Sequence, residues 1–197
     1  MKKIDLLLLA IIAISLFGCS KIADINSDGS YSPKYYQYFF AVNIKDAAGN
    51  DLVLPFQDMK PPVVGTKPEG YTLDVLVSPS PELNNESYLP YFVVTRIEDD
   101  YYLYYDLTYF QRNGKADKIV YQITFPDICG DGLNHEIETF WGNDPRLSPD
   151  KEHYSLKPEC TKAVFDGKEL DLKKLARFST SREGNYYIYY VDIVLDK

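Results

Sequence analysis

Residues that commonly bind metal ions or act as nucleophiles are scarce in this sequence of 197 residues. It has two histidines, His135 and His153, and three cysteines. Zinc sites draw most of their ligands from these two residue types, so the sequence predicts no metal site and no cofactor. It also contains no glycine-rich phosphate loop, no G-x-S-x-G elbow and no H-E-x-x-H motif. Since nothing indicates a Ser-His-Asp triad either, we predict no catalytic residue and a protein that is not an enzyme.

Basic residues are in the minority. The chain has 21 lysines and arginines against 29 aspartates and glutamates, and its formal net charge is −8. Such a surface repels nucleic acid and anionic lipid headgroups. We therefore expect no nucleic-acid partner, and any attachment to a membrane must come from something other than a basic patch.

Long apolar runs are also absent, apart from Leu6–Phe17 near the start of the chain. This run is shorter than the roughly 20 residues that span a bilayer, and two lysines precede it, which is typical of a signal peptide, here residues 1–18. The letters LFGC at 16–19 resemble the lipobox of bacterial lipoproteins, although Phe17 is bulkier than usual. The resemblance implies that Cys19 carries the lipid anchor, palmitate included, and that the protein lies at the outer membrane. The alternative is an ordinary signal peptide followed by an incidental cysteine.

Residues 19–34 are predicted to form a flexible tether behind the anchor. Asp24, Asn26 and Asp28 stand where a calcium loop of the EF-hand type places its first ligands. The twelfth position of such a loop needs a bidentate carboxylate, but here it is Tyr35. The tether interpretation is therefore preferred, and its extended reach is about 50 Å.

The other two cysteines, Cys129 and Cys160, form a potential pair in a chain predicted to be exported. Exported compartments permit disulfides, and a bridge here would close a loop of about 30 residues, worth about 3–4 kcal/mol. We expect this disulfide; the alternative is two buried thiols.

Segments rich in β-branched and aromatic residues dominate the rest of the chain. They predict strands at 35–44, 71–77, 91–98, 101–110, 118–125, 135–141, 161–165 and 186–195. Short turn signals such as Asp166-Gly167 separate several of them, which favours hairpins and antiparallel pairing. We predict an all-β fold, a single antiparallel β-sandwich over 35–197, with a closed barrel as the alternative. The segment that comes nearest to a helical pattern is 167–178.

Two segments are predicted to be irregular. Residues 55–70 are rich in proline and are expected to cross between sheets, whereas 142–159 form a polar loop with three prolines. Long loops of this kind are often functional. The predicted disulfide would hold the ends of the second segment together.

Tyrosine is unusually abundant, with 18 in the chain. In the strand 101–110, alternation places Tyr102, Tyr104 and Asp106 on the face opposite the core. Such a face could stack against sugar rings or contact another protein, so these residues, together with the sole tryptophan Trp141, form the candidate binding face. The alternative is that the tyrosines serve cross-strand packing and that Trp141 is a core or rim residue.

Glu136 and Glu138 are the strongest candidates for catalysis if the protein is an enzyme after all. Separated by two positions on a strand, they share one face and could work as a carboxylate pair in a glycan hydrolase. A solvated strand face with charged residues is the preferred explanation of both glutamates. A structural envelope component without a ligand is a further alternative.

The chain resembles small lipoproteins of Bacteroidetes-type bacteria in three stretches. These are FFAVNIKDAAGNDLV at 39–53, YQITFPDICGDGLNHEIETFWG at 121–142 and PECTKAVFDGKEL at 158–170. The resemblance covers about half of the chain after Cys19 and implies an Ig-like or related β-sandwich at the outer membrane, facing either the periplasm or the cell surface. It implies no active-site residues.

Overall fold

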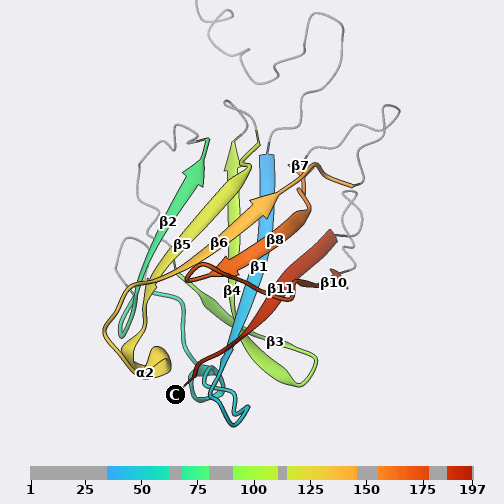
Figure 1. Ribbon diagram of the computed structural model, residues 1–197. Helices are drawn as coiled ribbons and strands as arrows, with labels where there is room; N and C mark the ends of the chain where they lie inside the picture. The colour runs from blue at the N-terminus through green and yellow to red at the C-terminus, as the bar shows by residue number, and fades with distance from the viewer. Residues whose placement is uncertain are drawn as a thin grey trace, which may run out of the picture. The chain divides into compact units, whose positions relative to one another are not determined.

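The structure, a computed structural model, describes residues 35–62, 68–79, 91–110, 115–145, 155–177 and 186–196. Their strands form two packed sheets, the β-sandwich predicted from the sequence (Figure 1). The first sheet contains β10 (Lys173–Arg177), β11 (Tyr186–Val194), β1 (Tyr35–Lys45), β4 (Asp100–Phe110) and β3 (Val93–Ile97), in this order, with β7 (Ser155–Leu156) also beside β1. The second contains β2 (Thr72–Ser78), β5 (Lys118–Thr124), β6 (His135–Trp141), β8 (Cys160–Phe165) and β9 (Lys168–Glu169).

The eight predicted strands are all confirmed, with small shifts at their ends. Two short helices accompany them, η1 (Leu54–Phe56) and α2 (Pro126–Cys129). Pairing is antiparallel as expected, except that β1 runs parallel to β7 and β11. The predicted irregular segment 55–70 does connect one sheet to the other, and 63–67 within it lie outside the described residues.

The segment 167–178, nearest to a helical pattern in the sequence, is a strand over most of its described length. It contains β9 and then β10, which pairs with β11 at the edge of the first sheet. Lysine, leucine and arginine are good helix formers, but pairing with a neighbouring strand overrides this weak preference. The exposed Lys173 and Lys174 suit an edge strand, because charged side chains discourage further strands from adding.

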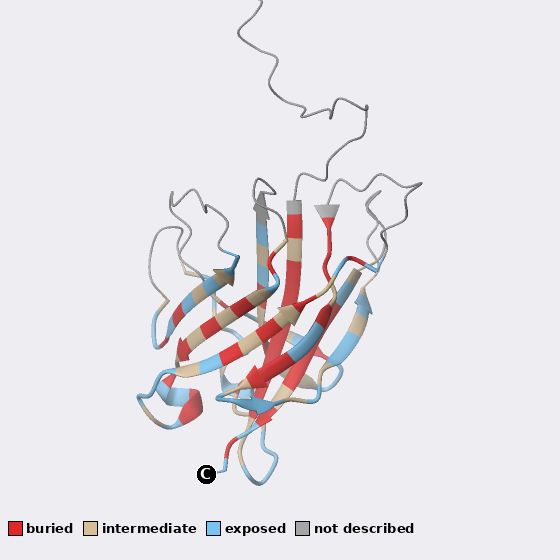
Figure 2. Ribbon diagram, turned by 45° about the horizontal axis from the view of Figure 1, so that its top comes forward, coloured by how far each residue is buried: buried red, intermediate tan, exposed pale blue. Residues whose placement is uncertain are grey.

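Strand β1 lies in the middle of the first sheet and is buried on both faces, as its red colour in Figure 2 indicates. One row faces the second sheet and consists of Tyr36, Tyr38, Phe40, Val42 and Ile44, all at most 8% exposed. The opposite row contains Phe39, Ala41 and Asn43, also buried. The near-continuous apolar sequence of this strand follows from burial on both sides.

Aromatic rings from both sheets fill the core between them. Phe40 of β1 stacks on Tyr121 of β5 with ring centres 5.7 Å apart, and Tyr105 of β4 meets the same ring edge-on at 5.4 Å. Tyr38 lies edge-on to Trp141 at 4.9 Å. Burying such a side chain contributes about 1.5–3 kcal/mol, so these contacts between the sheets are a major source of stability.

A second, smaller apolar group covers the outer face of the first sheet. This outer cluster consists of Phe39, Ala41, Ile97, Tyr102, Ile188 and Tyr190, with Tyr104, Leu175 and Tyr186 packed against it. The side chains come from all five long strands of the sheet. The outer face of this sheet is therefore largely apolar, and Tyr102 and Tyr104 of the candidate binding face lie within it.

Candidate functional site

The site is built around the second half of β4, which extends past the end of β3. Strand β3 pairs with residues 100–104 of β4 and begins at Val93, so no described strand pairs with 105–110 on that side. On its other side β4 is paired with β1 throughout 103–110. We call the unpaired side of residues 105–110 the open edge of β4. Natural sheets usually cover or shorten strand edges that have no partner.

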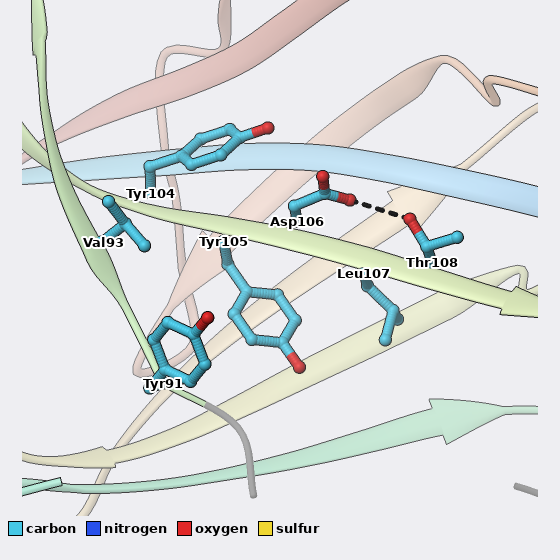
Figure 3. A pocket seen from close by; sticks show the side chains of 7 residues that line it. All are labelled: Tyr91, Val93, Tyr104, Tyr105, Asp106, Leu107 and Thr108. Atoms are coloured by element: carbon cyan, nitrogen blue, oxygen red, sulfur yellow. Dashed lines mark hydrogen bonds between the residues drawn. The ribbon is translucent and has the colours of Figure 1, made fainter. Parts of the chain in front are cut away.

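A cavity of about 440 Å³ lies along the open edge. In Figure 3, Tyr104, Asp106 and Thr108 project from one face of β4, whereas Tyr105 and Leu107 project from the other. The cavity is lined by residues from both rows and from the start of β3, namely Tyr91, Val93, Tyr104, Tyr105, Asp106, Leu107 and Thr108. It therefore wraps around the strand edge, and its volume falls within the range of about 300–1,000 Å³ typical of ligand sites.

Asp106 is the acidic group of this cavity. Its Oδ1 accepts a hydrogen bond of 3.0 Å from the hydroxyl of Thr108, two residues further along the strand. Partial removal from water raises the pKa of the Asp106 carboxyl, while Thr108 and the charge of Lys157 act in the opposite direction. Within the described part of the chain no ion pair reaches it. The carboxylate is thus placed to accept a donor or a cation from a ligand.

Tyr104 lies beside Asp106 and offers a flat ring with a polar end. It is half-buried against the outer cluster and forms part of the cavity wall. Burial, followed by the charge of Asp106, raises the pKa of its phenol well above the usual value. The hydroxyl consequently stays protonated and can donate a hydrogen bond.

Two residues of the candidate binding face, Tyr102 and Trp141, do not line the cavity. Tyr102 is only 3% exposed, and its hydroxyl donates to Asp192 Oδ1 at 2.8 Å, across β1. Asp192 in turn binds Lys173 at 2.6 Å, so Tyr102 has a structural role on this face. Trp141 is 4% exposed and lies in the core, where it donates to Thr139 Oγ1 at 2.8 Å. The odd-numbered residues of β6 face the core, and Trp141 is one of them.

The predicted disulfide is corrected by the structure, which has no bridge between Cys129 and Cys160. Cys129 ends α2, just before β6, and Cys160 pairs with Trp141 at the far end of that strand. A seven-residue strand is about 20 Å long, whereas a disulfide needs Cα atoms within about 7 Å. Both are buried thiols, and burial raises the pKa of Cys160 to about 12, so its thiolate is strongly disfavoured.

The ends of the predicted loop 142–159 are held together by other means. The main-chain N–H of Gly142 donates to Glu159 at 2.8 Å, and the buried Asp144 accepts from the N–H of Lys157 at 2.7 Å. These bonds extend the pairing of β6 and β8 beyond the strands themselves. Residues 146–154 of this loop lie outside the described residues.

The two glutamates proposed as a catalytic pair lie on the outer face of the second sheet. Glu136 accepts from Gln122 at 2.8 Å, and Glu138 is paired with Lys118. Both partners come from the neighbouring strand β5, where Gln122 lies directly opposite Glu136 and Lys118 lies diagonally across from Glu138. Neither carboxylate lines the cavity at β4. Cross-strand pairing on a polar face accounts for these residues, and the geometry gives no support to the hydrolase alternative.

His135 joins two turns of the second sheet. Its Nδ1 lies 2.7 Å from Asp166 Oδ2 in the β8–β9 turn, and its Nε2 lies 3.1 Å from Asp131 Oδ1 before β6. Burial lowers the pKa of His135, but the hydrogen bonds and charges of Asp166 and Asp131 outweigh it, and the net pKa is raised. The doubly protonated ring can donate to both carboxylates, whereas the neutral ring can donate to one.

This arrangement predicts a stability that depends on pH. A raised pKa in the folded state means that the stabilisation is complete below about pH 6.5, the unfolded value, and is lost as the pH rises through the folded value. His135→Gln should therefore lower the free energy of unfolding by about 1 kcal/mol at pH 5.5 and by less at pH 8.5, as measured by urea denaturation. A difference between the two proteins that stays constant over this range would contradict the prediction.

Other sequence predictions concern residues outside those described. Cys19, the tether 19–34 and the calcium-like residues Asp24, Asn26 and Asp28 all precede β1. In the described ranges, no group of three or more acidic, histidine or cysteine side chains is arranged to hold a metal ion. No helix among the described elements is both long and apolar enough to cross a membrane.

Sequence reasoning missed the cavity itself. Alternation in 101–110 leaves Tyr105 and Leu107 on the core side of the strand, and the predicted strand 91–98 includes Tyr91 and Val93. The one available signal was Pro90, because proline is disfavoured within strands and often precedes a shortened one. Comparison with known proteins adds nothing to the geometry, since no family model, no curated protein and no solved structure matches the chain.

Proposed function

We propose that this chain is a lipid-anchored protein of the bacterial outer membrane whose β-sandwich binds a protein or glycan partner at the open edge of β4. The observation that carries the proposal is the cavity, where the ring of Tyr104 and the carboxylate of Asp106 meet at the surface. A tyrosine ring provides apolar stacking area, and a neighbouring carboxylate and hydroxyl provide directional hydrogen bonds. A binding site that catalyses no reaction needs few groups besides such a ring, carboxylate and hydroxyl.

The place of the site in the fold is compatible with an anchor on Cys19. Strand β1 starts at Tyr35, directly after the predicted tether, and Tyr35 is paired with Phe110 at the end of β4. The open edge of β4 therefore lies at the end of the domain where the chain enters it (Figure 1). A tether of about 50 Å leaves room for a partner between this end and the lipid headgroups.

The proposal predicts a cross-link to the partner from Thr108, the exposed residue at the mouth of the cavity. Benzoylphenylalanine incorporated at Thr108 should yield a cross-linked product in cells, or the purified protein should bind on a glycan array. Thr72, exposed on β2 of the other sheet, is the matched control position and should give no product. Tyr104→Ala should reduce either signal at least about tenfold, because a buried aromatic contact is commonly worth more than 1.4 kcal/mol. If the protein with an intact Tyr104 gives neither the cross-link from Thr108 nor glycan binding, the proposal is rejected.

A further inference from the structure

We infer that the partner is an extended peptide segment of another protein, which adds to the first sheet as a strand along the open edge of β4 and places a lysine or arginine against Asp106. The inference rests on the proposed function, because it names the kind of partner that the same site takes. Strand addition to an open sheet edge is a general mode of peptide recognition, in which main-chain hydrogen bonds supply affinity and alternate side chains supply specificity.

The main chain of β4 is oriented for strand addition. The carbonyl of Tyr101 faces β1, because it accepts from the side chain of Asn43 on that strand. In a strand the N–H and C=O groups of successive residues point to opposite sides. Residues 106, 108 and 110 therefore direct both groups toward the open edge, where no described strand meets them. An added strand would satisfy these donors and acceptors.

The two rows of side chains at this edge specify a pattern for the added strand. One row, with Tyr104, Asp106 and Thr108, is polar and acidic, whereas the other, with Tyr105 and Leu107, is apolar (Figure 3). Side chains of an added strand would alternate between these two rows. A segment that alternates basic and apolar residues fits both.

The negative charge of the protein favours a lysine or arginine in the added strand. The whole chain carries a formal charge of −8, and Asp106 is an exposed carboxylate whose bond within the described residues comes from the Thr108 hydroxyl. The ring of Tyr104, two residues away on the same face, adds a surface over which a cation is attracted. A sugar stacked on a ring would occupy one face of β4, whereas the cavity continues around the edge to the other, and this favours a peptide.

The experiment measures binding of a fluorescent peptide of about eight residues with alternating valine and lysine. The comparison peptides carry glutamate in place of lysine, or N-methyl groups on alternate amides along one edge. We expect the lysine peptide to bind the full-length protein, and the glutamate and N-methylated peptides to bind at least about tenfold more weakly. Two methylated peptides are compared with the unmodified lysine peptide, one for each set of alternate amides. If both bind as tightly as the unmodified peptide, strand addition is overturned.

Variants test the same geometry from the protein side. Asp106→Lys should weaken the lysine peptide at least about tenfold and strengthen the glutamate peptide, whereas Asp74→Lys, the same change at an exposed position of β2, should do neither. Thr108→Pro removes one N–H from the open edge and none from the pairing with β1, and should also abolish peptide binding. An unchanged peptide preference in Asp106→Lys would overturn the inference.

A second copy of the protein or a glycan at the open edge would give different experimental results. Dimerisation of the protein that is lost in Thr108→Pro, measured by light scattering, would assign the edge to a second copy and overturn the inference. Binding on a glycan array that is lost in Tyr104→Ala, without any peptide binding, would also overturn it while leaving the proposed function standing. The proposed function fails separately, when cross-links from Thr108 and glycan binding are both absent.

Discussion

Replacement of Tyr38 by alanine is expected to lower the free energy of unfolding by about 4 kcal/mol. The side chain is fully buried in the centre of β1, and its ring packs against Trp141. Its hydroxyl also accepts a 2.8 Å hydrogen bond from the N–H of Ala116, which is itself fully buried. Alanine would create a cavity and leave that N–H without its acceptor, and both effects destabilise.

Urea denaturation followed by tryptophan fluorescence measures this effect, since the single tryptophan touches the altered position. Tyr38→Phe keeps the ring and loses the hydrogen bond, so it should cost about 1–2 kcal/mol. Tyr187→Ala is the matched control, because Tyr187 is 37% exposed and should cost much less. A loss for Tyr38→Ala no larger than that for Tyr187→Ala would contradict this account of the core.

The second large effect is expected at the predicted anchor. Cys19→Ser should move the protein from the membrane fraction to the soluble fraction and abolish labelling with a palmitate analogue. A single acyl chain binds membranes only marginally, with an association constant of about 10⁴ M⁻¹, whereas two or more chains hold stably. Because the chain is acidic, we expect no electrostatic attraction to replace the lipid.

Fractionation in low and high salt, together with mass spectrometry of the N-terminal peptide, tests this prediction. Ser20→Ala, which keeps the cysteine, is the control and should stay in the membrane fraction. A wild-type protein with an unmodified Cys19, or a Cys19→Ser variant that remains in the membrane fraction, would refute the anchor.

The strands were predictable because their signal is local. The aromatic and β-branched residues of 35–44 and the alternation in 101–110 appear directly in the sequence, and the turn Asp166-Gly167 also has the positive φ values that a tight hairpin requires. Strand β10 was not predictable in this way, since its lysines, leucine, alanine and arginine have no β preference and it forms only because β11 lies beside it.

The site could be predicted only in part. Alternation placed Tyr104 and Asp106 on one face, but it could not tell that Tyr102 would reach across β1 to Asp192 and become buried. The inward position of Trp141 and the separation of Cys129 from Cys160 both depend on which strands become neighbours. The cavity arises because β3 begins at Val93 while β4 continues, and the relative lengths of two paired strands are a property of the tertiary structure.

The parallel pairing of β1 with β11 has a consequence for the biogenesis of the protein. The first described strand of the domain obtains this neighbour from the last one, at Phe40–Lys45 and Tyr189–Val194. During synthesis β1 can pair with β4 earlier, but its pairing with β11 needs almost the entire polypeptide, and contacts so distant in sequence form slowly. For a chain exported unfolded through a translocation channel, as the predicted signal peptide implies, this part of the sheet would close only after the C-terminal strand had emerged on the far side.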